Sequence, residues 1–370
     1  MDALPGSLTE AFEVPGRLVE AEPLGSGHIH ATYVASLQPP AERRRVLIQR
    51  LNTAIFSDPE RLMENLIRVT DHQRRRLAER RVDDLDRRCL RVIPTREGRP
   101  LHVAPDGAYW RAFAFIEGAR SYDVAASPRQ AHAAARAFGS FDELLSDFPE
   151  PSPAVTIPHF HDLAARQRAL EASALADSHR RVARVEAELT AARDAYEQVS
   201  QLLDASGADD LPQRVVHNDC KLNNVLLDDQ SGEGICVIDL DTVMVGTVLS
   251  DFGELVRSAS CRAPEDARDP STVGFDLALF RALARGYLEG VAGMLTEPEL
   301  NALPAAGAAL SLENGIRFLT DHLSGDVYFR ATRENQNLER CRAQLTLVER
   351  QLEQLDAMRR ELTEAASERS

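Results

Sequence analysis

The sequence lacks the features of a disulfide-linked, zinc-binding or membrane-spanning protein. Its cysteines are odd in number and widely spaced, and none forms a Cys-x-x-Cys pair, so neither a disulfide nor a zinc framework is expected. No apolar run is long enough to cross a bilayer, and residues 1–16 lack the apolar centre of a signal peptide. These absences predict a cytoplasmic protein with free thiols. The five cysteines are Cys89, Cys220, Cys236, Cys261 and Cys341.

Positive charge is also scarce. The chain has 43 Lys and Arg residues against 58 Asp and Glu residues, a net charge of -15. Such an acidic balance argues against nucleic acid or an anionic membrane as the main partner, although it leaves room for a local basic pocket that binds a small anion. With 370 residues, the chain is too long for one compact core, which suggests two lobes.

The first part of the chain has the pattern of a sheet with one main helix. Residues 17–50 contain strand-type runs around a Gly-x-Gly turn. A helix is predicted to follow, with Asp58 as its N-cap and Pro59 at its first position. Residues 90–118 return to strand patterns that are broken by turn signals.

The later part is mainly helical. Residues 127–147 and 162–205 predict helices, the second segment as a pair, and almost everything from residue 251 onward has a helical pattern. Short apolar runs at 214–217 and 235–239 predict two strands. We therefore expect an α+β protein with a smaller N-terminal lobe built on an antiparallel sheet, residues 1–117, and a larger helical lobe, residues 118–370, that includes the helical segment 163–210.

One group of polar residues has the types and the spacing of a catalytic site. The stretch "VVHNDCKLNNVLLD" places His217, Asp219 and Asn224 in a His-x-Asp-x-x-x-x-Asn pattern. Phosphoryl transfer needs a carboxylate that accepts the proton of the attacking hydroxyl and an amide oxygen that helps to hold magnesium. A second strand-type run ends in Asp239, which supplies a carboxylate oxygen of the kind Mg²⁺ prefers. The sequence predicts Asp219 as the base, with Asn224 and Asp239 as metal ligands.

Asp251, Phe252 and Gly253 spell the metal-binding triplet of protein kinases, which makes Asp251 a rival metal ligand. However, Asp251 opens a helical pattern and has Glu254 three residues later, a spacing typical of a helix cap. We therefore expect Asp251 to cap a helix and to bond amides of the Asp219 segment. Asp241 lies two positions after Asp239, on the same side of an extended chain, and is expected to assist the metal or the loop.

The N-terminal part offers candidates for binding a nucleotide. Gly25 and Gly27 form a turn whose amides can cover phosphates. The run "VLIQRLN" has no Lys where a kinase-type lobe carries its basic residue, so Gln49 and Arg50 are the candidates, and Arg can bind phosphate bidentately. Glu117 lies in "FAFIEG", whose backbone is expected to bond adenine.

Together, "HNDCKLNNVLLD" and "VIDLDTVMVGTVLSDFGELVR" resemble the aminoglycoside phosphotransferase and choline kinase superfamily. Within it, "GSGHIHATY", "TIPHFHD" and "RFLTDHLSGDVYF" are similar to the bacterial N-acetylhexosamine 1-kinases. The resemblance implies a two-lobed protein-kinase-like fold and phosphorylation of the anomeric hydroxyl of GlcNAc or GalNAc with ATP and Mg²⁺. It also implies that His28, Arg317 and Tyr328 touch the sugar.

Two alternatives stay open from the sequence. The chain is either a kinase of another hydroxyl compound, such as an aminoglycoside or choline, or a kinase-like protein that binds nucleotide or sugar without catalysis. The missing Lys in "LIQR" favours the second alternative, whereas Asp219, Asn224 and Asp239 oppose it, because a binding protein needs no base.

Overall fold

The computed structural model describes residues 7–14, 16–24, 29–38 and 44–368. The chain divides into two compact units. The first unit consists of Met1–Ala119, Phe148–Pro158 and Ile235–Met244, and the second of Arg120–Asp147, His159–Gly234 and Val245–Ser370. The segments Phe148–Pro158 and Ile235–Met244 thus belong with the N-terminal part, whereas the predicted division at residue 117 placed them in the C-terminal lobe.

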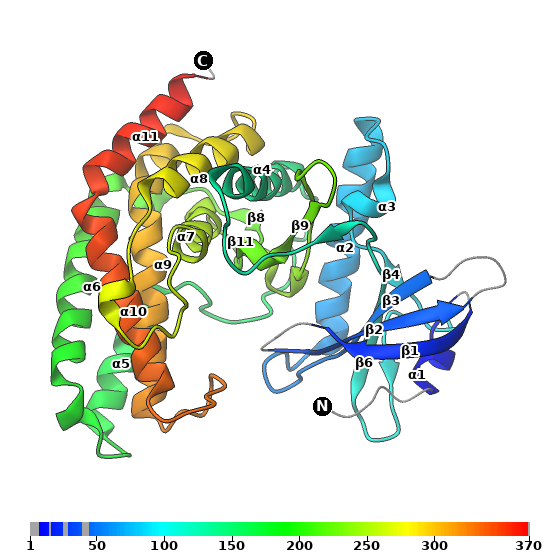
Figure 1. Cartoon of the computed structure of the whole chain (residues 1–370), viewed down its shortest axis with the longest axis horizontal. Helices are drawn as coiled ribbons and strands as arrows, with labels where there is room; N and C mark the ends of the chain where they lie inside the picture. The colour runs from blue at the N-terminus through cyan, green and yellow to red at the C-terminus, as the bar shows by residue number, and fades with distance from the viewer. Residues whose placement is uncertain (1–6, 15, 25–28, 39–43, 369–370) are drawn as a thin grey trace. The chain divides into compact units, whose positions relative to one another are not determined.

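The first unit is built on a six-stranded antiparallel sheet in the order β1-β2-β3-β6-β4, with β5 paired to β6 (Figure 1). Its main helix, α2, begins as predicted, because the Asp58 side chain accepts a hydrogen bond from the Arg61 amide and Pro59 follows the cap. The elements are α1 (Ser7–Ala11), β1 (Arg17–Pro23), β2 (Ala31–Gln38), β3 (Arg44–Arg50), α2 (Pro59–Glu79), α3 (Leu85–Arg88), β4 (Val92–Ile93), β5 (His102–Val103) and β6 (Tyr109–Ala114).

The two faces of this sheet differ in chemistry. Alternate residues of β2 and β3, such as Tyr33, Leu37 and Ile48, are buried in an apolar cluster with Phe12, the residue that follows α1. On the opposite face lie Gln49 and Arg111, and the Arg111 Nη1 atom lies 3.8 Å from the sulfur of Met63 on α2. The second face therefore carries buried polar groups.

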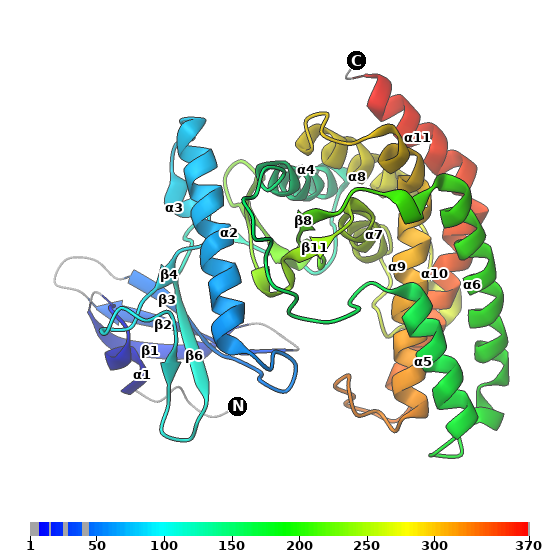
Figure 2. The ribbon, with the colours of Figure 1, turned by 180° about the vertical axis from the view of Figure 1, so that it is seen from behind.

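The second unit is mainly helical. Helix α4 begins at Ser127 and Pro128 as predicted, because the Ser127 hydroxyl accepts a bond from the Gln130 amide. Seen from behind, α5, α6, α9 and α10 run along one another (Figure 2). Its elements are α4 (Pro128–Leu144), α5 (Leu163–Ala176), α6 (Glu186–Ser206), β8 (Arg214–Val216), β9 (Val225–Asp228), α7 (Val248–Ala259), α8 (Leu277–Gly290), α9 (Glu297–Leu323), α10 (Gln336–Glu353) and α11 (Leu355–Ser367).

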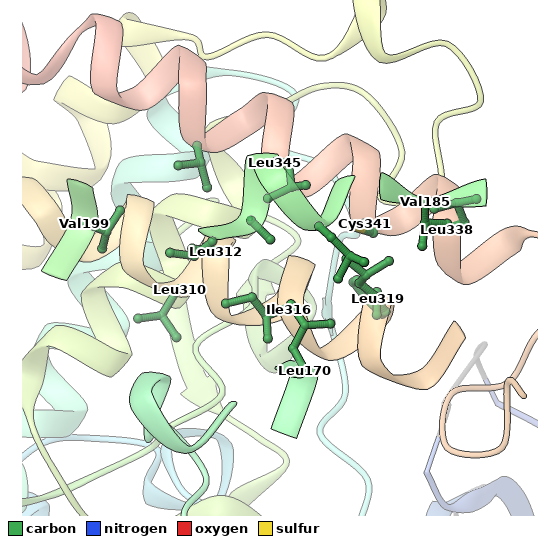
Figure 3. Packing of buried hydrophobic residues seen from close by; sticks show 14 of the residues in the cluster. Leu170, Val185, Val199, Leu310, Leu312, Ile316, Leu319, Leu338, Cys341 and Leu345 are labelled. Atoms are coloured by element: carbon green, nitrogen blue, oxygen red, sulfur yellow. The ribbon is translucent and has the colours of Figure 1, made fainter. Parts of the chain in front are cut away.

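An apolar cluster holds these helices together (Figure 3). Leu170, Val199, Ile316 and Leu345 come from α5, α6, α9 and α10, and each is buried. Burial of one such side chain contributes about 1.5–3 kcal/mol. The predicted helix pair at residues 162–205 is confirmed as α5 and α6, and both pack against α9.

The short strands β7 (Ala119–Arg120), β10 (Gly234–Val237) and β11 (Met244–Gly246) each contain a point where the chain passes from one unit to the other. The fold class is confirmed as α+β, with an antiparallel sheet in the N-terminal part and helices in the C-terminal part. All five cysteines are free, as expected. Within the described ranges, no helix is both long and apolar enough to span a membrane.

Candidate active site

The segment from His217 to Asn224, here called the Asp219 loop, connects β8 to β9 and ends in a 3₁₀ turn (Leu222–Asn224). His217 fixes its beginning. The imidazole is buried and packs edge-on against Phe138 and Phe141 of α4, with ring centroids 5.6 and 5.5 Å away. Its Nδ1 atom accepts a hydrogen bond of 3.2 Å from the Asp219 amide. His217 is therefore an anchor of the loop.

Asp219 is held by two neighbours within its own loop. The Lys221 Nζ atom lies 2.6 Å from Asp219 Oδ1. The Asn224 side-chain nitrogen donates to Asp219 Oδ2 at 3.1 Å and to the Asp219 carbonyl at 2.9 Å. Because the nitrogen of Asn224 points at Asp219, its side-chain oxygen is the atom that can meet a cation.

Charge in this loop favours an ionised Asp219. Burial alone would raise the pKa of Asp219, but the nearby Lys221 ammonium outweighs burial and lowers it. Burial would likewise lower the pKa of Lys221, but Asp219 outweighs that effect and raises it. At neutral pH the loop thus presents a carboxylate, which can accept a proton, beside an ammonium, which can stabilise negative charge.

Asp251 braces this loop, as the sequence predicted. Its Oδ2 and Oδ1 atoms accept hydrogen bonds from the amides of His217 (2.7 Å) and Asn218 (2.5 Å). The prediction that Asp251 caps the helix is wrong, because α7 begins at Val248 with Thr247 at its N-cap. Asp251 lies in the first turn, fully buried, where a carboxylate is favourable near the positive end of the helix dipole.

A second buried acid, Asp142, lies next to Asp251. Asp142 on α4 accepts a hydrogen bond of 2.6 Å from the Tyr287 hydroxyl. Burial and then the charge of Asp251 raise the pKa of Asp142 well above its ordinary value. Asp142 therefore holds its proton to a higher pH than an ordinary Asp side chain does.

The first unit contains a separate buried network centred on Asp241. The Arg111 guanidinium binds the Asp241 carboxylate bidentately, at 2.6 and 2.8 Å, and His30 Nε2 lies 2.6 Å from Asp241 Oδ2. The Asn52 amide donates to His30 Nδ1 at 3.1 Å, so the proton of the neutral imidazole sits on Nε2 and points at Asp241. Burial would raise the pKa of Asp241, but Arg111 and His30 outweigh burial and lower it.

The expectation that Asp241 assists the metal is wrong. Both of its oxygens accept bonds from Arg111 or His30, which makes it an anchor on the sheet. The physical reason is local: Asp239 has a φ of 60° and residues Leu240–Thr242 form a 3₁₀ turn, so the chain is not extended here and alternation does not apply. A non-glycine residue in the left-handed region often marks a functional position, which fits the role predicted for Asp239.

The predicted nucleotide residues fall into three groups. Gly25 and Gly27, like the predicted sugar ligand His28, lie outside the described residues. Gln49 lies on the polar face, where it donates to the Thr32 hydroxyl (3.0 Å) and accepts from Arg111 (2.9 Å).

The remaining two nucleotide candidates are exposed. The Arg50 side chain is 54% exposed and lies 3.7 Å from Asp106. Glu117 forms an ion pair with Arg45 of β3. Of Gln49 and Arg50, Gln49 is therefore the one that faces the buried polar network of the first unit.

In the second unit, the predicted sugar residues lie together. The Arg317 guanidinium lies 5.7, 5.9 and 5.3 Å from the ring centroids of Phe160, Tyr328 and Phe329. Asp321 fixes the segment that carries Tyr328, because its carboxylate accepts hydrogen bonds from the amides of residues 327, 328 and 329 at 2.8–2.9 Å. Tyr328 is exposed. We call this surface the Arg317 wall, defined by Phe160, Arg317, Tyr328 and Phe329.

The Arg317 wall is connected to the Asp219 loop. His161, next to Phe160, lies 2.7 Å from the Asn218 carbonyl and 3.0 Å from Glu313, which lies one helical turn before Arg317 on α9. Arg166 Nε lies 3.8 Å from Glu313, and burial followed by the charge of Arg317 lowers the pKa of Arg166. The Glu313 carboxylate is thus paired with His161 and lies near Arg166. In the part of the chain that the structure describes, no cluster of His, Cys, Asp and Glu has the makeup of a metal site.

Sequence reasoning missed several of these residues. Lys221 was detectable, because a Lys two positions after the proposed base lies near enough to contact it. The partners of Asp241 were not, since Arg111 and His30 are 130 and 211 residues away in sequence. Local patterns carry no signal for such contacts.

Comparisons with known proteins show the family to which the chain belongs. A family model for the phosphotransferase enzyme family (APH) matches residues 21–294. Similar solved structures include an aminoglycoside phosphotransferase from Alicyclobacillus acidocaldarius (14% identity, 98% of each chain, TM-score 0.64). A microcompartment-associated aminopropanol kinase (18% identity, 95% of this chain and 97% of that one, TM-score 0.58) is also similar.

A third similar structure is a choline kinase from Cryptosporidium parvum, with 14% identity over 95% of this chain and 93% of that chain and a TM-score of 0.54. At such low identity these structures show the fold, which is the protein-kinase-like fold of small-molecule kinases. The family match is the stronger finding, because it spans more than half of the chain and includes both Asp219 and Asp239. By this match, the chain belongs to the phosphotransferase enzyme family.

Proposed function

We propose that this protein is an ATP- and Mg²⁺-dependent kinase that phosphorylates the anomeric hydroxyl of an N-acetylhexosamine. The observation that carries the proposal is the Asp219 carboxylate, held between Lys221 and Asn224 on a loop braced by Asp251. Such a carboxylate can orient the acceptor hydroxyl and take its proton. A base with a lowered pKa is adequate, because positioning and electrostatics provide most of the catalysis in phosphoryl transfer.

The metal ligands in this proposal are Asn224 and Asp239. Their donor atoms fit, because an amide oxygen and a carboxylate oxygen are hard ligands of the kind Mg²⁺ takes together with phosphate oxygens and water. When bound, the ion neutralises charge between the β- and γ-phosphates. Lys221, 2.6 Å from the proposed base, adds a second positive charge beside the acceptor hydroxyl.

The acceptor class follows from the Arg317 wall. Arg317 belongs to this wall, and Arg166 and His161 lie beside it. The nearby carboxylates of Glu313 and Asp321 already bind His161 and backbone amides, so a cationic acceptor such as choline or an aminoglycoside would meet like charges. Arg and exposed aromatic side chains suit a neutral sugar, which offers hydroxyl acceptors and an apolar ring face. The resemblance of "TIPHFHD" and "RFLTDHLSGDVYF" to N-acetylhexosamine 1-kinases supports the same class.

An acceptor panel tests the proposal. ATP consumption is measured with N-acetylhexosamines, neutral hexoses and cationic alcohols at equal concentration. We expect the highest kcat/KM with an N-acetylhexosamine, by at least about tenfold over any cationic alcohol, which corresponds to one unfavourable charge contact. A preference for choline or an aminoglycoside would contradict the acceptor class, and magnesium-dependent binding of ATP without turnover of any acceptor would indicate a non-catalytic protein.

We expect different effects from replacing the two rival carboxylates, Asp239 and Asp251. For Asp239→Asn, we expect the Mg²⁺ concentration that gives half-maximal turnover to rise at least about tenfold, because a direct ligand is lost. For Asp251→Asn, we expect an unchanged Mg²⁺ requirement and a loss of about 1–3 kcal/mol in the free energy of unfolding, because one buried amide loses its acceptor. Mg²⁺ titrations and urea unfolding of both variants measure these effects. A shifted Mg²⁺ requirement in Asp251→Asn alone would reverse the assignment.

A further inference from the structure

His161 lies where it can act on the Asp219 loop without touching a substrate. Its Nε2 atom is 2.7 Å from the carbonyl oxygen of Asn218, the residue before the proposed base. Its Nδ1 atom is 3.0 Å from Glu313 Oε2, and the Glu313 side chain is only 2% exposed. The imidazole thus connects the backbone of the loop to a buried carboxylate on α9.

These two partners determine the charge of His161. A backbone carbonyl only accepts hydrogen bonds, so Nε2 must carry a hydrogen, and an ionised carboxylate also only accepts, so Nδ1 must carry one too. Burial would lower the pKa of His161, but Glu313 and the Asn218 carbonyl outweigh burial and raise it. The other charged groups around this pair are Arg166 and Arg317, beside Glu313, and Glu254 of α7.

The residue that His161 contacts has an unusual backbone. Asn218 has a φ of 65°, in the left-handed region that few non-glycine residues adopt. Its amide donates to Asp251 at 2.5 Å, and its side-chain oxygen accepts from the Ser250 hydroxyl at 3.0 Å. The carbonyl at its other end is the group that His161 holds, and this carbonyl belongs to the peptide that sets the direction of Asp219.

We propose that doubly protonated His161 is a positioning residue that fixes the Asn218–Asp219 peptide, so that turnover depends on its charge. The proposal rests on the assignment of Asp219 as the base. When His161 loses a proton, the Glu313 carboxylate keeps the remaining hydrogen on Nδ1, and Nε2 then presents a lone pair to the Asn218 carbonyl. The bond is lost and the peptide is released.

Deprotonation of His161 should lower kcat as the pH rises. Because the folded pKa of His161 is raised above its ordinary value, the charged form and its hydrogen bond are complete at acidic pH and are lost as the pH rises through the folded pKa. We therefore expect kcat to fall on the alkaline side. The imidazole whose titration causes this fall binds Glu313 and the Asn218 carbonyl, and not the proposed metal ligands, among the described residues.

Three variants of the full chain separate positioning from folding. His161→Asn cannot titrate, so we expect it to lose the alkaline fall and to lower kcat roughly 10- to 100-fold, as expected for the loss of a charged hydrogen bond. In Glu313→Gln, the amide can donate to Nδ1, so neutral imidazole keeps its bond to Asn218, and we expect kcat to show no alkaline fall. His159→Asn is the matched control, because His159 is 73% exposed and its ring pairs with Asp162.

Nitrogen NMR of the histidine side chains provides a readout that does not depend on turnover. We expect both nitrogens of His161 to be protonated at neutral pH and the amide signals of residues 217–224 to shift as His161 titrates. A neutral His161 at neutral pH would overturn the proposal. So would a charged His161 together with an unchanged pH profile in His161→Asn. If no acceptor is phosphorylated, the proposed function fails, and the NMR titration alone decides whether His161 controls the loop.

Discussion

Replacement of Asp219 by Asn lowers kcat by about 10²- to 10⁴-fold, the usual contribution of a positioned proton acceptor. Asn has nearly the same shape as Asp but accepts no proton at neutral pH. It also gives up the ion pair with Lys221, whose Nζ lies 2.6 Å from Asp219. Because the loss concerns interactions in the transition state, we expect the KM for ATP to change by less than about threefold.

Steady-state kinetics with saturating ATP and acceptor measure this effect. Asp356→Asn is the matched control, since the Asp356 side chain is 81% exposed and pairs with Arg359 on the same helix. Near-ultraviolet circular dichroism should show the same tertiary structure in both variants. An Asp219→Asn enzyme with nearly wild-type kcat would show that another group takes the proton.

Replacement of Asp241 by Asn is expected to cost about 3–5 kcal/mol in the free energy of unfolding, because it leaves Arg111 buried without a compensating charge. Both side chains of this pair are only 2% exposed, and the guanidinium binds the carboxylate at 2.6 and 2.8 Å. Asn can accept at one oxygen only, so a second bond from Arg111 or His30 is lost as well.

Urea unfolding of the full chain measures the change. Asp106→Asn is the control, because Asp106 forms an exposed ion pair with Arg50 at 3.7 Å, which solvent screens and which should contribute less than about 1 kcal/mol. The pKa of Asp241 is lowered, so its contribution is complete above the ordinary Asp pKa of about 3.9 and is lost as the pH falls through the folded value. The loss in the free energy of unfolding caused by Asp241→Asn should therefore be constant from weakly acidic to neutral pH. Equal losses in the free energy of unfolding for Asp241→Asn and Asp106→Asn would contradict the stabilising role of the buried network.

The parts of the fold that sequence predicted are those whose signals are local. Asp58 and Ser127 cap α2 and α4 as expected, since a cap and a following proline lie within a few residues of each other. The Asp219 loop was found because its residues lie at most seven positions apart. Asp251 was correctly predicted to bond amides of this loop.

The parts that could not be predicted depend on burial and long-range contact. Helix α7 is buried on nearly every side, and its start was placed three residues too late, at Asp251 and not at Val248. The turn after Asp239 breaks the alternation on which the prediction for Asp241 depended. Gln49 was recognised as a candidate, but its place in a network with Thr32 and Arg111 depends on the register of three strands.

Phosphorus NMR of the product tests the proposed reaction most directly. The protein is incubated with ATP, Mg²⁺ and an N-acetylhexosamine, and the new phosphate signal is correlated with the protons of the sugar. We expect one phosphomonoester signal coupled to the anomeric proton, formed by the wild-type protein and at least about 10²-fold more slowly by Asp219→Asn. A phosphate on another hydroxyl, release of inorganic phosphate alone, or equal rates in the two proteins would contradict the proposed chemistry.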